Sequence, residues 1–295
     1  MRPAPGAAPP PRRRLLGIGD NTLDTYLDLG LQFPGGNAVN VAVFARRLGA
    51  ASGYLGCLGD DAGGDHLYEA LGAEGVHLGL CRRRAGANAR ALIGLEAGER
   101  RFLAADPGVR ARYGLAAEDF AAIAGYEVVH TGINSEIDAE LPRLRATGAL
   151  ISYDFSDKFG KASAAEALPA IDIAFLSCPW HADEDAAALL RSFANAGPAI
   201  VVATRGAKGA MALAGGALYR QAAVPVRPLD TLGAGDAFIA AFLLAHLDGQ
   251  EITAPLAAGV RFAATVCGAH GAFGHPRAWA ISADPSILER TRSER

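Results

Sequence analysis

The chain has 295 residues, about half of them apolar, which is enough to build the core of one α/β domain. Its formal net charge of −3 excludes a general electrostatic attraction to nucleic acid or to an anionic membrane. No apolar run reaches the length of a spanning helix, and the cysteines, Cys57, Cys81, Cys178 and Cys267, have no paired spacing. We therefore expect a cytoplasmic protein with reduced thiols and no membrane or nucleic-acid partner.

The two ends of the chain differ in composition from the middle. Residues 1–14 are rich in Pro, Ala and Arg, and they predict a disordered tail. Residues 283–295 predict a second, charged tail. Residues 15–282 therefore form the predicted folded domain.

Between the tails, short apolar segments alternate with segments of helical spacing. The predicted strands are 15–19, 53–58, 127–130, 150–153, 171–176 and 199–203. The predicted helices are 36–48, 65–73, 118–123, 136–146, 183–194, 237–247 and 254–268. This alternation predicts an α/β fold, with a mostly parallel sheet covered by helices on both faces. Two strand-like stretches, about 22–33 and 88–104, break the alternation and predict an extra β layer.

The most informative stretch is DTLGAGDAF at residues 230–238, which leads into an apolar helix. Bare amides at Gly233, Ala234 and Gly235, backed by a helix dipole, predict an anion site. Asp236 in that turn would repel a phosphate, so it indicates a base that deprotonates an attacking hydroxyl during phosphoryl transfer. The simpler alternative is that Asp236 caps the helix.

A second stretch, GGNAVN at residues 35–40, suits a polyol. Gly35 and Gly36 allow close approach of the backbone, and they open a helix. Asn37 and Asn40 lie one turn apart, on one face, and an amide donates and accepts as a sugar hydroxyl does. Alternatively, Asn37 is a cap and Asn40 an incidental polar residue.

Other polar positions follow predicted strands. Asp20 and Asp24 come after the first strand, and open α/β sheets bind ligands at the carboxyl ends of their strands. TRGAKG at 204–209 follows another strand, but it lacks the spacing of a Walker motif. Alone, it predicts the entry to a hairpin rather than a phosphate loop.

DTLGAGDAF resembles the C-terminal signature of the ribokinase-type (PfkB) carbohydrate kinases, and GGNAVN resembles their N-terminal signature. Both occur in the expected order, and the similarity spans about residues 15–275. The resemblance implies a ribokinase-like fold, ATP-dependent phosphorylation of a primary sugar hydroxyl, and a β lid over the sugar built from 22–33 and 88–104. It also implies a homodimer contact through that lid.

The resemblance also implies individual roles. Asp24 matches the family's sugar-binding aspartate, with Asp20 as a further candidate. The residues implied on the ATP side are Lys158, Thr204, Gly206, Gly209, Thr231 and Gly271. On the lid, Arg90 is a candidate substrate contact beside Glu96, Arg100 and Arg101, although hairpin charges are often only solvated.

The chain departs from the family in two places. SCPW at 177–180 replaces an Asn-x-x-Glu element that is linked to Mg²⁺, and DFSDK at 154–158 replaces an Asp-x-Asn-x-Arg run. Mg²⁺ is still expected with ATP, since polyphosphate charge needs neutralising, but its protein ligands and any need for K⁺ stay open. These departures resemble the fructoselysine 6-kinase branch, which implies the 6-hydroxyl of fructoselysine or a related fructosamine as acceptor. Fructokinase and ribokinase activities are the alternatives.

Two rival classes fit less well. An NAD-dependent oxidoreductase is suggested by Gly17 and Gly19, but Thr22 stands where a third glycine is needed. A non-catalytic sugar-binding protein would have no use for Asp236 in an intact anion turn.

Overall fold

The structure is a computed structural model that describes residues 13–96, 99–112, 114–160 and 162–279. Residues 1–12 and 280–295, which hold most of the two predicted tails, lie outside the described residues. Within the described part, no helix is long and apolar enough to cross a membrane. All four cysteines are free thiols.

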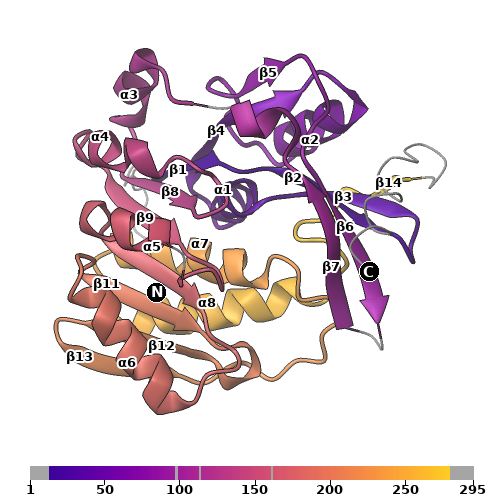
Figure 1. Cartoon of the computed structure of the whole chain (residues 1–295). Coiled ribbons are helices and arrows are strands. Elements are labelled where there is room, and N and C mark those ends of the chain that lie inside the picture. The colour runs from indigo at the N-terminus through magenta and orange to yellow at the C-terminus, as the bar shows by residue number, and fades with distance from the viewer. Residues whose placement is uncertain (1–12, 97–98, 113, 161, 280–295) are drawn as a thin grey trace, which may run out of the picture.

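The main sheet has nine strands within the described residues, in the order β13-β12-β11-β10-β9-β8-β1-β4-β5 (Figure 1). They are β1 Arg14–Gly19, β4 Ala51–Gly59, β5 Arg82–Arg84, β8 Val128–Gly132, β9 Leu150–Asp154, β10 Ile173–Ser177, β11 Ile200–Thr204, β12 Ala210–Ala214 and β13 Ala217–Gln221. Neighbours from β5 to β11 run parallel, while β12 and β13 form an antiparallel edge. The mostly parallel sheet predicted from the alternation is confirmed.

Helices cover both faces of this sheet. One face packs against α1 Asn37–Arg47, α2 Ala62–Ala73, α7 Ala234–Leu247 and α8 Thr253–Val266. The other packs against α3 Ala117–Ile123, α4 Leu141–Arg145, α5 Ala162–Ala167 and α6 Asp183–Ala194. Successive strand residues alternate between the two cores, as Leu15 and Leu16 do. The helix α7 is buried from Ala237 to Leu243, directly after its first turn, and this packing fixes the position of its N-terminus.

A second sheet stands beside the main one, at the right of Figure 1. Its strands, in the order β14-β3-β2-β6-β7, are β14 Arg277–Ala278, β3 Leu31–Gly35, β2 Thr22–Tyr26, β6 Arg90–Glu96 and β7 Glu99–Asp106. Its small core of Tyr26, Phe33 and Ile93 packs against Leu232, just before α7. The extra β layer is confirmed, and it reaches the DTLGAGDAF turn.

The structure differs from the predicted elements in two respects. The helix expected over 136–146 is shorter, because α4 begins only at Leu141, next to Pro142, and proline is tolerated only in the first turn. The strands β12 and β13 were not predicted. They make the turn 204–209 a hairpin connection between β11 and β12, with a 3-10 turn at Gly206–Lys208.

The contact between β1 and α1 is unusually close at Gly17. A Cβ at Gly17 would lie 2.2 Å from the carbonyl oxygen of Ala38, the second residue of α1. No side chain fits there, so glycine sets the distance between the helix and the sheet.

We expect Gly17→Ala to lower the free energy of unfolding by about 1–3 kcal/mol, because α1 must move away from the sheet. Gly72→Ala in α2 is the matched control, since its Cβ would meet nothing within 4 Å. It should stabilise by about 0.5–1 kcal/mol through helix propensity. Denaturant unfolding of both variants is the measurement, and equal stability of Gly17→Ala and wild type would contradict the close approach.

Candidate active site

The candidate site lies at the carboxyl ends of the central strands. The order of the sheet reverses at β1, because β4 lies on one side of it and β8 on the other. Such a switch point is where open α/β sheets bind ligands. Here the N-termini of α1 and α7 meet side chains from β8 and β9.

The turn before α7 leaves fewer amides bare than predicted, because Ala234 N donates to Thr231 O at 3.2 Å. Gly233 is the N-cap residue, with a left-handed φ of 76°, and its Cβ position would lie 2.6 Å from that of Ala272. By contrast, a Cβ on exposed Gly235 would meet nothing within 4 Å. The first amides of a helix have no intrahelical acceptor. The space beside Gly235 therefore adjoins the positive end of α7, which suits an anion.

Asp236, in the first turn of α7, is held from both sides by α1. Asn37 Nδ2 donates to Asp236 Oδ1 at 2.8 Å, and Asn40 Nδ2 donates to Asp236 Oδ2 at 2.6 Å. The two asparagines do share one helix face, as predicted. The structure directs both amides at a protein carboxylate.

Asn37 also joins Asp236 to a second acid. Its Nδ2 donates to Asp154 Oδ2 at 3.1 Å, and its Oδ1 lies 2.9 Å from His130 Nε2. Because the NH₂ group faces two carboxylates, Oδ1 must face the histidine, so Nε2 is the protonated nitrogen. His130 Nδ1 then accepts from the hydroxyl of Ser152, 2.9 Å away. Every donor of Asn37 is committed within the protein.

Burial supports that tautomer. His130 and Ser152 have no exposed surface, and they are register partners on β8 and β9. Desolvation lowers the pKa of His130 to about 3, so the ring is neutral at ordinary pH. A neutral imidazole with one donor and one acceptor fixes the orientation of Asn37.

This arrangement disfavours the ionised form of Asp154. Burial first, and then the negative charges of Asp236, Asp20 and Asp157, raise its pKa to about 7, although a hydrogen bond from Ser156 N opposes the shift. Two acids joined by one amide cannot both ionise freely.

Asp20 has a structural contact that the sequence did not show. Its carboxylate accepts from the backbone amides of Asn37 at 2.8 Å and Ala38 at 3.0 Å, and it is 4 % exposed. It therefore satisfies the first amides of α1. The neighbouring Gly36 has φ 109°, and its Cβ would lie 2.6 Å from Asn21 Cα. This glycine is required by protein contacts and not only by a ligand.

Asp24 and Arg90 lie on the second sheet, on the paired strands β2 and β6. Asp24 is buried, and a Cβ at Gly35 would lie 2.3 Å from its Oδ2. Arg90 Nη2 is 3.9 Å from Asp61. The side chains of Glu96, Arg100 and Arg101 lie outside the described part.

The predicted ATP residues are spread along the same sheet edge. Thr204 Oγ1 donates to Leu176 O at 3.3 Å, Gly206 is exposed, and Gly209 is buried with φ 88°. Lys158 is exposed and donates to Asn134 Oδ1 at 2.5 Å. No described contact joins Lys158 to α7.

Asp230 organises the other side of the turn. Its Oδ2 accepts from Tyr26 Oη at 2.5 Å and from Gly271 N at 3.0 Å, and its Oδ1 accepts from Leu232 N at 2.9 Å. Thr231 is exposed beside it, and Thr231 O accepts from Ala234 N. Asp230 thus ties the second sheet to the α7 turn and to the loop at Gly271.

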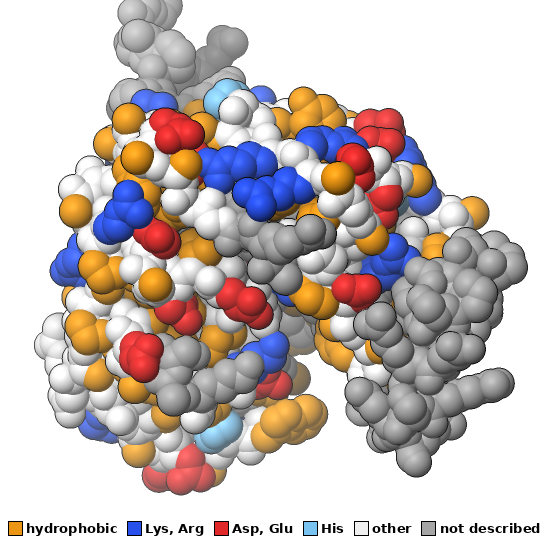
Figure 2. Space-filling view, turned by 45° about the horizontal axis from the view of Figure 1, so that its top comes forward, with side chains coloured by type: hydrophobic (Ala, Val, Ile, Leu, Met, Phe, Trp, Pro, Cys, Tyr) orange, Lys and Arg blue, Asp and Glu red, His pale blue; other side chains and the backbone are white. Residues whose placement is uncertain are grey.

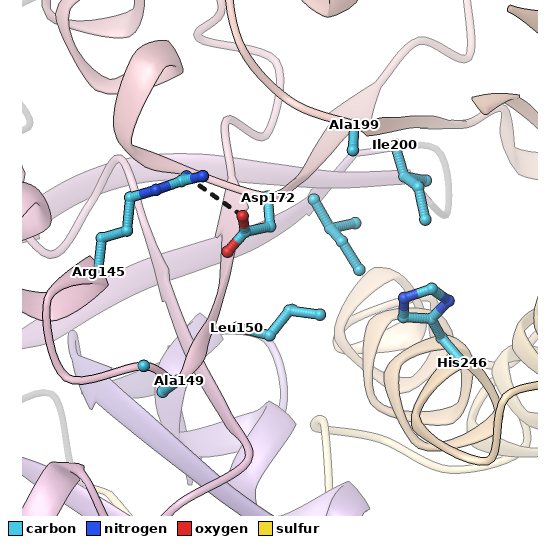
Figure 3. A pocket seen from close by; sticks show the side chains of 9 residues that line it. Arg145, Ala149, Leu150, Asp172, Ala199, Ile200 and His246 are labelled. Atoms are coloured by element: carbon cyan, nitrogen blue, oxygen red, sulfur yellow. Dashed lines mark ion pairs between the residues drawn. The ribbon is translucent and has the colours of Figure 1, made fainter. Parts of the chain in front are cut away.

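A separate pocket of about 480 Å³ lies at the opposite edge of the sheet, at the amino ends of β9, β10 and β11. Figure 3 shows Arg145 paired with Asp172 at 3.2 Å on one wall and His246 on the other. His246 lies near the C-terminal end of α7 and Asp236 near its N-terminal end, so this pocket is separate from the acids described above. On the face seen in Figure 2, acidic and basic side chains are interspersed rather than forming one extended field of either sign.

His130, Ser152 and Asp154 were not predicted as site residues. The available signal was a polar side chain inside or at the end of an otherwise apolar strand. Among the described residues, no group of three His, Cys, Asp or Glu side chains could hold a metal ion.

The raised pKa of Asp154 predicts how stability varies with pH. The folded protein holds this proton up to about pH 7, whereas the unfolded chain releases it near pH 4, so ionisation of Asp154 disfavours folding as pH rises between those values. From about pH 5 to pH 8, the stability of Asp154→Asn relative to wild type should therefore increase, by about 2–4 kcal/mol. Denaturant unfolding of both proteins across this range is the measurement. A difference that stays constant with pH would contradict the shift.

Comparison with known proteins identifies the family. The model of the pfkB family carbohydrate kinases matches residues 30–277. Fructosamine kinase FrlD of Bacillus subtilis is 36 % identical over 283 residues, covering 95 % of this chain and 99 % of that protein. Fructoselysine 6-kinase of Escherichia coli is 36 % identical over 261 residues, covering 88 % and 100 %.

The fold agrees with that match. The structure of Arabidopsis thaliana ribokinase complexed with ribose and ATP superposes with a TM-score of 0.78, at 20 % identity, over 96 % of this chain and 99 % of the ribokinase. The fold is therefore ribokinase-like, as the two signatures predicted. The chain belongs to the pfkB family and is an ATP-dependent carbohydrate kinase.

Proposed function

We propose that this kinase transfers the γ-phosphoryl group of ATP to the 6-hydroxyl of fructoselysine or a related fructosamine, with Asp236 as the base. The observation that carries the base assignment is the position of this carboxylate. The Asp236 carboxylate accepts hydrogen bonds from Asn37 and Asn40, next to the open space at Gly235. Similarity to two enzymes named as a fructosamine kinase and a fructoselysine 6-kinase supports the substrate class.

In the proposed reaction, the 6-hydroxyl donates its proton to Asp236 as its oxygen attacks the γ-phosphorus. A new O–P bond forms, the bond from the γ-phosphorus to the bridging oxygen breaks, and ADP leaves. The amide of Gly235 and the dipole of α7 stabilise the charge on the transferring group. Asn37 and Asn40 keep the carboxylate in place during the transfer.

Mg²⁺ supplies charge neutralisation on the phosphates when ATP is bound. Mg²⁺ prefers oxygen ligands and retains water, and it usually binds through substrate phosphates and one or two carboxylates. The described part of the chain fits that mode, because it offers carboxylates but no three-ligand group. Asp183 is already paired with Arg205 at 2.7 Å, so it is a poor candidate.

The remaining roles are also part of the proposal. Asp24, Gly35 and Arg90 contact the sugar from the second sheet, which acts as a lid and as a dimer contact. The ATP side comprises Lys158, Thr204, Gly206, Gly209, Thr231 and Gly271. These six ATP-side residues lie next to the carboxyl edge of the main sheet or on loops beside α7.

We expect Asp236→Asn to lower kcat by about 10²–10⁴, the contribution of a positioned base, while ATP still binds. The fold can accept the change, because among the described residues Asn40 Oδ1 has no partner, so a flip of Asn40 gives the introduced amide an acceptor. Asp248→Asn, at the exposed C-terminal end of α7, is the control and should keep wild-type kcat. Near-normal kcat in Asp236→Asn would reduce Asp236 to a helix cap.

The substrate assignment predicts a higher kcat/KM for fructoselysine than for fructose, since contacts with the amine portion help orient the 6-hydroxyl. A coupled ATPase assay with Mg²⁺-ATP and each sugar at matched concentrations measures the ratio. Ribose and a nucleoside complete the screen. Equal or faster turnover of any of these neutral compounds would remove the fructosamine assignment and leave another sugar kinase activity.

A further inference from the structure

We propose that Asp154 binds the ammonium group of the sugar–amine substrate, so that the enzyme selects a cationic sugar adduct over a neutral sugar. This inference rests on the proposed function, and it concerns a carboxylate that phosphoryl transfer itself does not use. Four observations carry it: the shortage of hydrogen-bond donors, the balance of charge, the fixed orientation of the Asp154 carboxylate, and its distance from Asp236.

The site has an excess of acceptors. Asn37 Nδ2 gives its hydrogens to Asp154 and Asp236, and Asn40 Nδ2 donates to Asp236. Asn40 is only 3 % exposed, and its Oδ1 has no hydrogen-bond partner among the described residues. A buried acceptor without a donor is costly. A ligand that fits this place must therefore bring donors, as hydroxyl and ammonium groups do.

The charge at Asp154 is not compensated within the described part of the chain. The groups that act on it are Asp236 from α7, Asp20 after β1, Asp157 on its own loop and the Asn37 amide from α1. No described lysine or arginine forms an ion pair with it. A hydroxyl would leave this repulsion in place, whereas an ammonium group would neutralise it.

The orientation of Asp154 is fixed before any ligand arrives. Ser156 N donates to its Oδ1 at 2.8 Å. Asn37 holds Oδ2. Fixed by both contacts, the carboxylate does not need to reorganise on binding, which favours affinity.

The distance to Asp236 suits one sugar. Asn37 Nδ2 is 3.1 Å from Asp154 and 2.8 Å from Asp236, so the two carboxylates lie within two hydrogen-bond lengths of each other. In the furanose form of a fructosamine, C1 and C6 are attached to C2 and C5, the two carbons that flank the ring oxygen, so the amine and the 6-hydroxyl lie along the same edge of the ring. One molecule can thus present its 6-hydroxyl to Asp236 and its secondary ammonium to Asp154.

The first test compares Asp154→Asn with wild type on fructoselysine and on fructose. Loss of the charge partner of the ammonium group should lower kcat/KM for fructoselysine by about 100-fold, and lower kcat/KM for fructose much less, because fructose brings no cation. Asp185→Asn, an exposed acid in α6 that does not act on Asp154, is the control and should keep the wild-type preference. If Asp154→Asn retains the preference for fructoselysine, the ammonium site is wrong.

A second test needs no variant. Near pH 7, Asp154 is partly protonated in the free enzyme, so a bound cation should expel that proton. Calorimetry of fructoselysine binding in buffers of different ionisation enthalpy should show net proton release, and fructose binding should show none. Equal proton release for both sugars would overturn the proposal.

The two proposals fail differently. Poor turnover of fructoselysine by wild type would defeat the proposed function. Efficient turnover by wild type, with an unchanged preference in Asp154→Asn and no proton release, would defeat only the role of Asp154.

Discussion

The site depends on the hydrogen bonds that two asparagines donate to one carboxylate. Asn37 and Asn40 from α1 each donate to a different oxygen of Asp236 in α7. This fixes the starts of two helices against each other, although the residues are 199 and 196 positions apart. These two hydrogen bonds can form only if both helices lie at the right distance from the sheet. Gly17 sets that distance for α1.

Two further carboxylates support that arrangement from outside. Asp20 satisfies the first amides of α1, and Asp230 joins Tyr26, Leu232 and Gly271 around the turn before α7. The Asp230 side chain therefore links the second sheet, the turn before α7 and the loop at Gly271. A chain of hydrogen bonds behind Asn37, through His130 to Ser152, completes the support.

The sequence predicted most of the fold because its alternation is strong and local. It also singled out Asp236 as a candidate base, since an acid within a predicted anion site is chemically unusual, and that role stays a prediction. It could not show what Asn37 and Asn40 contact, because that depends on how two distant helices meet. The strand β12 escaped prediction because its sequence, AMALA, is rich in alanine, which has weak strand propensity. The strand β13, ALYRQ, has no apolar alternation of its own to predict it.

His130 and Asp154 show a different limit. Each lies in or at the end of a strand whose apolar pattern is clear, and the sequence drew attention to Asp154 only as part of the DFSDK run. The contacts of these two residues follow from the register, which places them beside Ser152 and Asn37. Asp20 was expected to face a ligand, because it follows β1. Its capping of α1 follows only from the position of that helix.

The most direct test of this account is a crystal structure with fructoselysine, Mg²⁺ and a non-hydrolysable ATP analogue. We predict the 6-hydroxyl within hydrogen-bond distance of Asp236, and the γ-phosphate in the open space at Gly235, against its amide. A γ-phosphate bound away from the start of α7, or a sugar whose 6-hydroxyl does not reach Asp236, would contradict the central claim.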